Sequence, residues 1–95
     1  MTRSELAACA EALGKIGDQR SVAAVRDACD YIRDYPEYSS FSNEDLFQAY
    51  HALATLGEKP AALTELKLYS DEHLSRMEPR TQREFSDKFK ESQSW

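Results

Sequence analysis

The 95-residue chain has the size of one domain, and its 41% hydrophobic and 31% charged residues are typical of a folded chain rather than a disordered one. Its 17 acidic and 12 basic side chains give a net charge of −5, which works against non-specific attraction to nucleic acid. No run of residues approaches the roughly 18 apolar residues of a membrane span, and the N-terminus lacks the apolar stretch of a signal peptide. We therefore expect a single cytoplasmic domain over 1–95, without membrane or direct nucleic-acid partners.

Apolar residues spaced three and four apart predict two helices in the first third of the chain. The stripe of the first helix is Leu6, Cys9, Ala10, Leu13 and Ile16. The stripe of the second helix, over 19–34, is Val22, Val25, Cys29 and Ile32. Gly17 suits the left-handed position that ends a helix, and Pro36 disfavours a helical conformation at the residue before it. The two helices form a predicted hairpin over 2–34, followed by a loop over 35–43.

The same spacing continues through a second predicted hairpin over 44–77, which turns at Gly57. Pro60 fits the first turn of its second helix, and a break near Ser70 is left open. A capping-box pattern, TQRE, begins a C-terminal helix over 81–92. No segment alternates with a period of two. The sequence thus predicts an all-α fold of about five helices, at least about 65% helical and without a sheet.

The two predicted hairpins are related by an internal repeat. An offset of 40 residues aligns ELAACAEALGKIGD (5–18) with DLFQAYHALATLGE (45–58), and the identical positions include the turn glycines. The segment AEALGKIGD resembles the first helix and turn of a HEAT-like repeat, and tetratricopeptide hairpins have a similar turn. The resemblance covers about 5–32 and, more weakly, 45–69. It implies two stacked antiparallel hairpins, with the helix over 81–92 as a cap; a homodimer is the alternative way to complete so short a stack.

No pattern of residues indicates catalysis or a cofactor. Cys9 and Cys29 would lie about 10 Å apart in an antiparallel hairpin, beyond the reach of a disulfide, so we expect two buried, reduced thiols. His51 and His73 have no neighbours at metal-ligand spacing and no nucleophile fixed beside them. The sequence therefore predicts no metal, no cofactor and no enzymatic activity.

The negative charge is concentrated in the middle of the chain. From Asp27 to Asp45 the acids outnumber the bases enough to give −5, which equals the charge of the whole protein. Aromatic residues are interleaved with these acids. One interpretation is that the aromatic side chains cover the core; the other is a contact patch for a basic protein, because tyrosine is enriched at interface hot spots. The candidate partner-binding residues are Tyr31, Asp34, Tyr35, Glu37, Tyr38 and Phe41.

These features favour a small protein–protein interaction module, such as an adaptor, chaperone-like binder, immunity protein or inhibitor, that acts through an acidic-aromatic face on a basic partner. Two alternatives stay open. One is an inhibitor that mimics nucleic acid and blocks a DNA- or RNA-binding protein. The other is a non-catalytic subunit of a larger assembly.

Overall fold

The computed structural model describes residues 2–36 and 40–95, and only the backbone of residues 40–42. The structure is 89% helical, and no strand occurs in the part of the chain that it describes. This confirms the predicted all-α fold. The main helices are α1 (Arg3–Ile16), α2 (Val22–Asp34), α3 (Ser40–Leu53), α4 (Lys59–His73) and α5 (Pro79–Ser92). Three short segments join them, namely η1 (Gln19–Ser21), η2 (Ala54–Glu58) and η3 (Leu74–Arg76).

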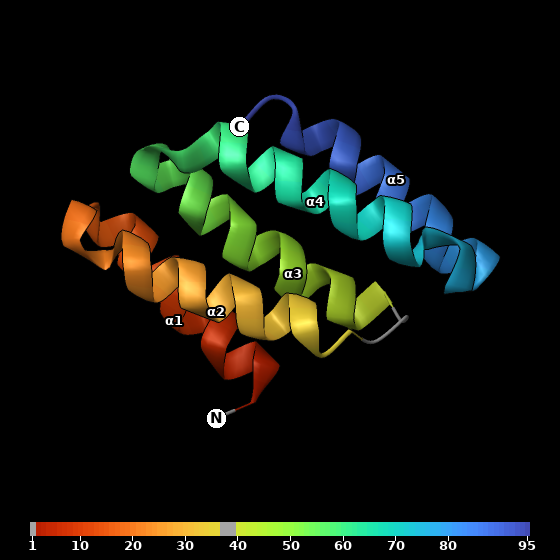
Figure 1. Cartoon of the computed structure of the whole chain (residues 1–95), viewed down its shortest axis with the longest axis horizontal. Coiled ribbons are helices and arrows are strands. Elements are labelled where there is room, and N and C mark those ends of the chain that lie inside the picture. Colours follow the sequence, from red (N-terminus) through yellow and green to blue (C-terminus); the bar gives the residue numbers. More distant parts are fainter. Residues whose placement is uncertain (1, 37–39) are drawn as a thin grey trace.

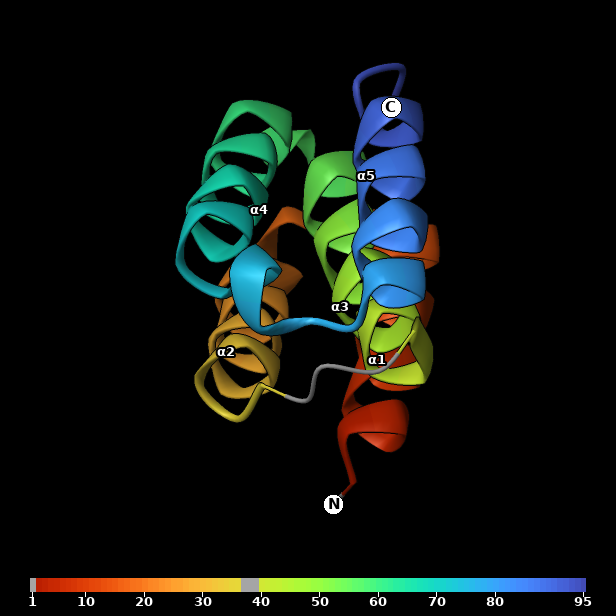
Figure 2. The same ribbon diagram turned by 90° about the vertical axis from the view of Figure 1, so that its right-hand side faces the viewer.

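Helix α3 is the centre of the molecule. It contacts α1, α2, α4 and α5, and Figure 1 shows it between the first hairpin, α1 and α2, and the pair α4 and α5. Seen from the side in Figure 2, α2 and α4 lie on one side of the molecule and α1 and α5 on the other. A helix surrounded in this way must be apolar around most of its circumference. The sequence of α3 meets this need with Leu46, Phe47, Ala49, Tyr50, Ala52 and Leu53, all of which are buried.

Helix α1 packs against α3 through small residues, which corrects the predicted stripe. Its buried residues are Ala7, Ala10 and Gly14, whereas Ile16 is 72% exposed. Leu6 and Leu13 are partly buried and pack against the edge of the core. The spacing of three and four fits the predicted stripe and also Ala7, Ala10 and Gly14. These three residues face α3 because their small side chains let the two backbones come close together.

The closest approach of the two helices is at Gly14. A Cβ atom placed there would lie 3.1 Å from both the Cα and the Cβ of Ala52, which is tighter than ordinary contact. Two hydrogen bonds join the same helices towards their N-termini. Gln48 donates to the carboxylate of Glu11, and the Ser4 hydroxyl donates to Asp45 across 3.2 Å. The contact between α1 and α3 thus combines a steric fit with polar bonds along its edge.

Both turns use the predicted glycines. Gly17 ends α1 with φ of 75° and ψ of 18°, and Gly57 has φ of 95° within η2, where the chain kinks between α3 and α4. These positive φ angles favour glycine over residues that carry a Cβ. The glycines at equivalent places in the repeat therefore perform the same function, as the alignment predicts.

Two predicted helix boundaries differ from the structure, which also decides the break left open near Ser70. Helix α3 begins at Ser40, inside the predicted loop over 35–43, so Asn43 is buried within the helix, where its amide approaches the Met77 sulfur. Helix α5 begins at Pro79 rather than in the TQRE segment, because proline, with fixed φ and no N–H, suits a first helical turn. Helix α4 continues through Ser70, and η3 follows it.

The two cysteines have opposite environments, which partly corrects the sequence prediction. Both are free thiols as predicted, but Cys9 is exposed and only Cys29 is buried. Burial of Cys29 between α2 and its neighbours raises its thiol pKa to about 12, and the negative charge of Glu65 adds to this effect. Only the thiolate is nucleophilic, so Cys29 is unreactive in the folded protein.

The first testable consequence concerns Gly14. Because the added side chain would meet the backbone of Ala52, Gly14→Val should lower the free energy of unfolding by about 1 to 3 kcal/mol, as overpacking usually does. The matched control is Ala12→Val on the exposed face of the same helix, which should cost only the difference in helix propensity, about 0.5 kcal/mol. Chemical denaturation of dilute samples measures both. Equal stabilities for the two variants would contradict the close approach.

The second consequence concerns the thiols. In dilute solution we expect a maleimide to label one thiol per chain quickly, at Cys9, and to label Cys29 only after the protein unfolds. Mass spectrometry of the labelled protein counts the sites. In a Cys9→Ser variant the fast label should disappear. Rapid labelling of both thiols in the native state would show that Cys29 is accessible.

Candidate functional site

Three of the six predicted partner-binding residues come together at the end of α2. The rings of Tyr31 and Tyr35 lie one helical turn apart, with centroids separated by 4.7 Å and planes inclined by 40°. Tyr31 is 43% exposed and Tyr35 is 60% exposed, so this pair does not cover the core. Asp34 lies between them in the sequence and is also exposed. The result is an aromatic pair on the surface beside a carboxylate.

Arg33 forms ion pairs with three carboxylates near this tyrosine pair. Its guanidinium group lies 3.3 Å from Asp30 and 3.5 Å from Asp34 on its own helix, and 3.7 Å from Glu65 on α4. One cation therefore faces three carboxylates, and the surface keeps a net negative charge. Exposed pairs of this kind add little to stability. Their effect is to hold the acids in place beside the tyrosines.

The other predicted residues are not placed by the structure. Glu37 and Tyr38 lie outside the described residues, and Phe41 belongs to α3 by its backbone, with nothing described of its side chain. The described part of the site is therefore Tyr31, Asp34 and Tyr35. We call these three residues the tyrosine patch.

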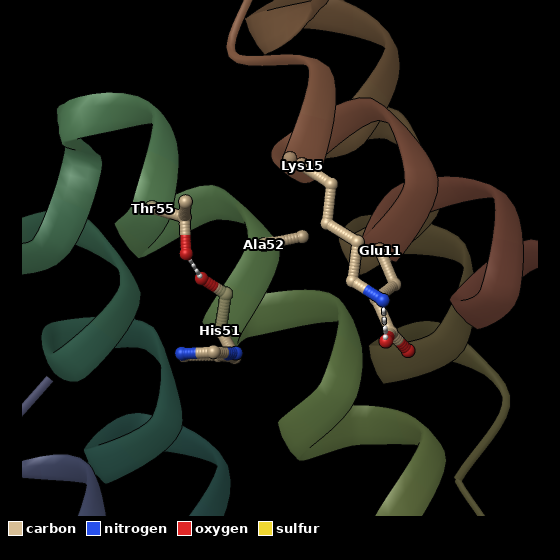
Figure 3. A pocket seen from close by; sticks show the side chains of 6 residues that line it. Glu11, Lys15, His51, Ala52 and Thr55 are labelled. Carbon is tan, nitrogen blue, oxygen red and sulfur yellow. Dashed lines mark hydrogen bonds and ion pairs between the residues drawn. The ribbon is translucent and has the colours of Figure 1, made fainter.

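A second feature, a small depression between α1 and α3, was not predicted from the sequence. Its volume is about 80 Å³, and Figure 3 shows the side chains around it. Its lining residues are Glu11, Gly14, Lys15, His51, Ala52 and Thr55. It exists because Gly14 has no side chain and Ala52 has only a methyl group to fill the space above their contact. No motif or spacing marks these residues in the sequence, because they come from two helices joined only by the fold.

The polar groups of this depression are already engaged. The hydrogen bond from Gln48 and the ion pair with Lys15, at 3.1 Å, lower the pKa of Glu11 and keep it ionised. The Thr55 hydroxyl donates to the His51 carbonyl across 2.9 Å, as the dashed line in Figure 3 shows. The His51 ring contacts Trp95, with centroids 5.0 Å apart. The depression is large enough for only a few water molecules.

Another group of polar residues lies between α2, α3 and α4 and consists of Tyr50, Arg33 and Glu65. Tyr50 is fully buried, with its hydroxyl near the Glu65 carboxylate; burial raises the pKa of Tyr50, and the charge of Glu65 raises it further. Arg33 closes the cluster on the solvent side through its ion pair with Glu65. Among the described residues, no group of three or more histidine, cysteine or acidic side chains could hold a metal ion.

The comparisons with known proteins add one finding. Residues 6–31 match the family model of the PBS lyase HEAT-like repeat, and no curated protein or solved structure matches the chain. No helix in the described part of the structure is long and apolar enough to cross a membrane. The match covers α1, η1 and most of α2, which is the hairpin whose AEALGKIGD segment carries the predicted resemblance. The match supports the predicted HEAT-like helical repeat in the first hairpin, and units of this kind build helical protein-interaction modules.

Proposed function

We propose that this chain is a small interaction module of the adaptor, chaperone-like binder, immunity protein or inhibitor type, which acts by binding a basic protein rather than by catalysis. The observation that carries the proposal is the exposed pair Tyr31 and Tyr35 beside Asp34 at the end of α2. The two free thiols suit a reducing compartment such as the cytoplasm.

The aromatic pair supports the proposal because of what tyrosine contributes at an interface. A tyrosine side chain offers a large contact area and a hydroxyl group, and it has few rotatable bonds to immobilise on binding. In this chain each ring already rests on the other, so the pair is partly fixed before a partner arrives. Interface energy is usually concentrated in a few such anchors.

The acids support a basic partner rather than a neutral one. Asp30 and Asp34 share the single cation of Arg33, and Asp27 precedes them on the same helix. A surface of one sign attracts a partner of the opposite sign over a distance of roughly 8 Å at physiological salt. Such attraction speeds the encounter more than it tightens the complex. We include Glu37, Tyr38 and Phe41 in the proposed surface because they continue the same acidic-aromatic sequence after Tyr35.

The test begins by capturing the partner from the native host with the full chain and identifying it by mass spectrometry. Purified partner is then titrated with Tyr31→Ala, Tyr35→Ala and Asp34→Lys variants. Each tyrosine variant should weaken binding by about 1 to 3 kcal/mol, or roughly 5- to 150-fold, without a change in Tm. Asp34→Lys should mainly slow association and reduce its dependence on salt.

The matched control is Ile16→Ala, which truncates a side chain that is 72% exposed beside the turn at Gly17, at the opposite end of the first hairpin from the tyrosine patch. It should bind like the wild type. Tyrosine variants that lose Tm, with binding reduced only in proportion to the folded fraction, would show that these side chains stabilise the fold instead. Wild-type affinity in both tyrosine variants would reject the proposed surface.

A further inference from the structure

Helix α1 carries a second apolar face, which points away from α3. We call it the outer face. Its members share one side of the helix and are all exposed, and they are Glu5, Ala8, Cys9, Ala12 and Ile16. The face is apolar over three turns, with Glu5 at one end and Lys15 beside the other.

The internal repeat relates this face of α1 to a face of α3 in the second repeat unit. On α3, the residues that contact α1 are Asp45, Gln48 and Ala52, whose partners are Ser4, Glu11 and Gly14. Subtracting the 40-residue offset of the repeat from these three positions gives Glu5, Ala8 and Ala12. The outer face of α1 is thus the equivalent of the α3 face that α1 covers.

Exposure shows the difference between the two units. Leu56 is 1% exposed and Ala49 is fully buried, whereas their equivalents Ile16 and Cys9 lie on the surface, Ile16 with 72% of its area accessible. The same side of the repeat is therefore covered in the second unit and open in the first. A helix packs on this side of α3, which makes a helix the natural occupant of the open side of α1.

The opposite end of the stack is closed. There Phe85 of α5 lies 5.0 Å from the Phe47 ring, and Trp95 lies 6.5 Å from the same ring and 5.0 Å from His51. Phe47 and His51 are the repeat equivalents of Ala7 and Glu11, so α5 and Trp95 stand where a further repeat would pack. The outward side of α5 is charged, as a terminal cap requires.

We propose that the outer face of α1 binds the outer face of α1 in a second copy of this chain, with the two helices antiparallel across a two-fold axis. A second copy cannot offer the inner face of its α1, which α3 occupies, or its far end, which α5 closes. The outer face is the open apolar side of the repeat stack, and two-fold symmetry makes contact between identical faces closed and self-limiting.

The charges of α1 suit this arrangement. With Ala8 of one copy opposite Ala12 of the other, antiparallel helices place Glu5 level with Lys15 of the second copy, twice across the axis; the exposed Lys15 amine, which pairs with Glu11 in its own chain, is long enough to reach that carboxylate as well. The alanines allow close approach, as Gly14 and Ala52 do inside the molecule. One pair of 14-residue helices buries less than the roughly 1,200 Å² of a standard interface, so we expect a reversible dimer that depends on concentration.

Sedimentation velocity on the purified full chain tests the proposal directly and needs no other partner. From about 1 µM to about 1 mM, the average mass should rise from the 10.8 kDa of the monomer towards twice that value. An Ala12→Arg variant should weaken association at least roughly tenfold, because it places unpaired charges at the axis. Leu68→Arg, which adds the same charge at an exposed site on α4, should associate like the wild type.

Two further measurements distinguish the proposed geometry from a general loss of folding. Glu5→Lys alone should weaken the dimer, and adding Lys15→Glu in the same chain should restore it. The Cys9 thiols would lie about 10 Å apart across the axis, so a short bismaleimide should link two wild-type chains, and Cys9 should react more slowly as the concentration rises.

A monomer throughout the concentration range would overturn the inference. So would a dimer that Ala12→Arg leaves intact while circular dichroism shows the variant folded. Neither result would bear on the basic partner proposed for the tyrosine patch, since these measurements use the chain alone.

Discussion

The fold depends on how closely α1 can approach α3. At Gly14 even one added carbon would lie 3.1 Å from two atoms of Ala52, so the two backbones meet with almost nothing between them. Ala7 and Ala10 continue this small surface along α1. Since α1 takes up so little space, α3 can sit at the centre of the molecule with α2, α4 and α5 packed on its other sides. The buried residues of α3 then form the middle of the core, and the other helices pack their apolar residues around them.

The central position of α3 also decides where polar groups can lie. Along its contact with α1, Gln48 donates a hydrogen bond to Glu11, and Asp45 accepts one from Ser4. Toward α2 and α4 it presents Tyr50, whose buried hydroxyl lies beside charged groups that reach the surface through Arg33 and Glu65. The charged side chains of this region therefore lie near the surface. The depression in Figure 3 is the space that is left above the contact between α1 and α3.

The sequence predicts well those features that depend on single residues or on regular spacing. Gly17, Gly57 and Pro36 mark real helix ends, and the five helices follow from apolar positions three and four apart. It fails for α1 because two sets of residues share that spacing. Of the predicted stripe, Leu6, Ala10 and Leu13 do pack on the core, whereas Cys9 and Ile16 point outward and the small residues Ala7 and Gly14 take their place against α3. Side-chain size at a helix contact is decided by the partner helix, which periodicity does not reveal. For the same reason the tyrosine patch could be inferred from α2 alone, while the depression, formed by two helices, could not.

The position of Trp95 has a practical consequence for following the molecule in solution. It is the single tryptophan of the chain, and it rests against Phe47 and His51 of the central helix. Its fluorescence therefore reports whether the C-terminal segment is docked, separately from the helical signal that the remainder of the protein gives. Partial opening of this end, with α1 to α4 still folded, would change the emission before the far-ultraviolet spectrum. The chain thus contains its own optical probe for local unfolding of the cap.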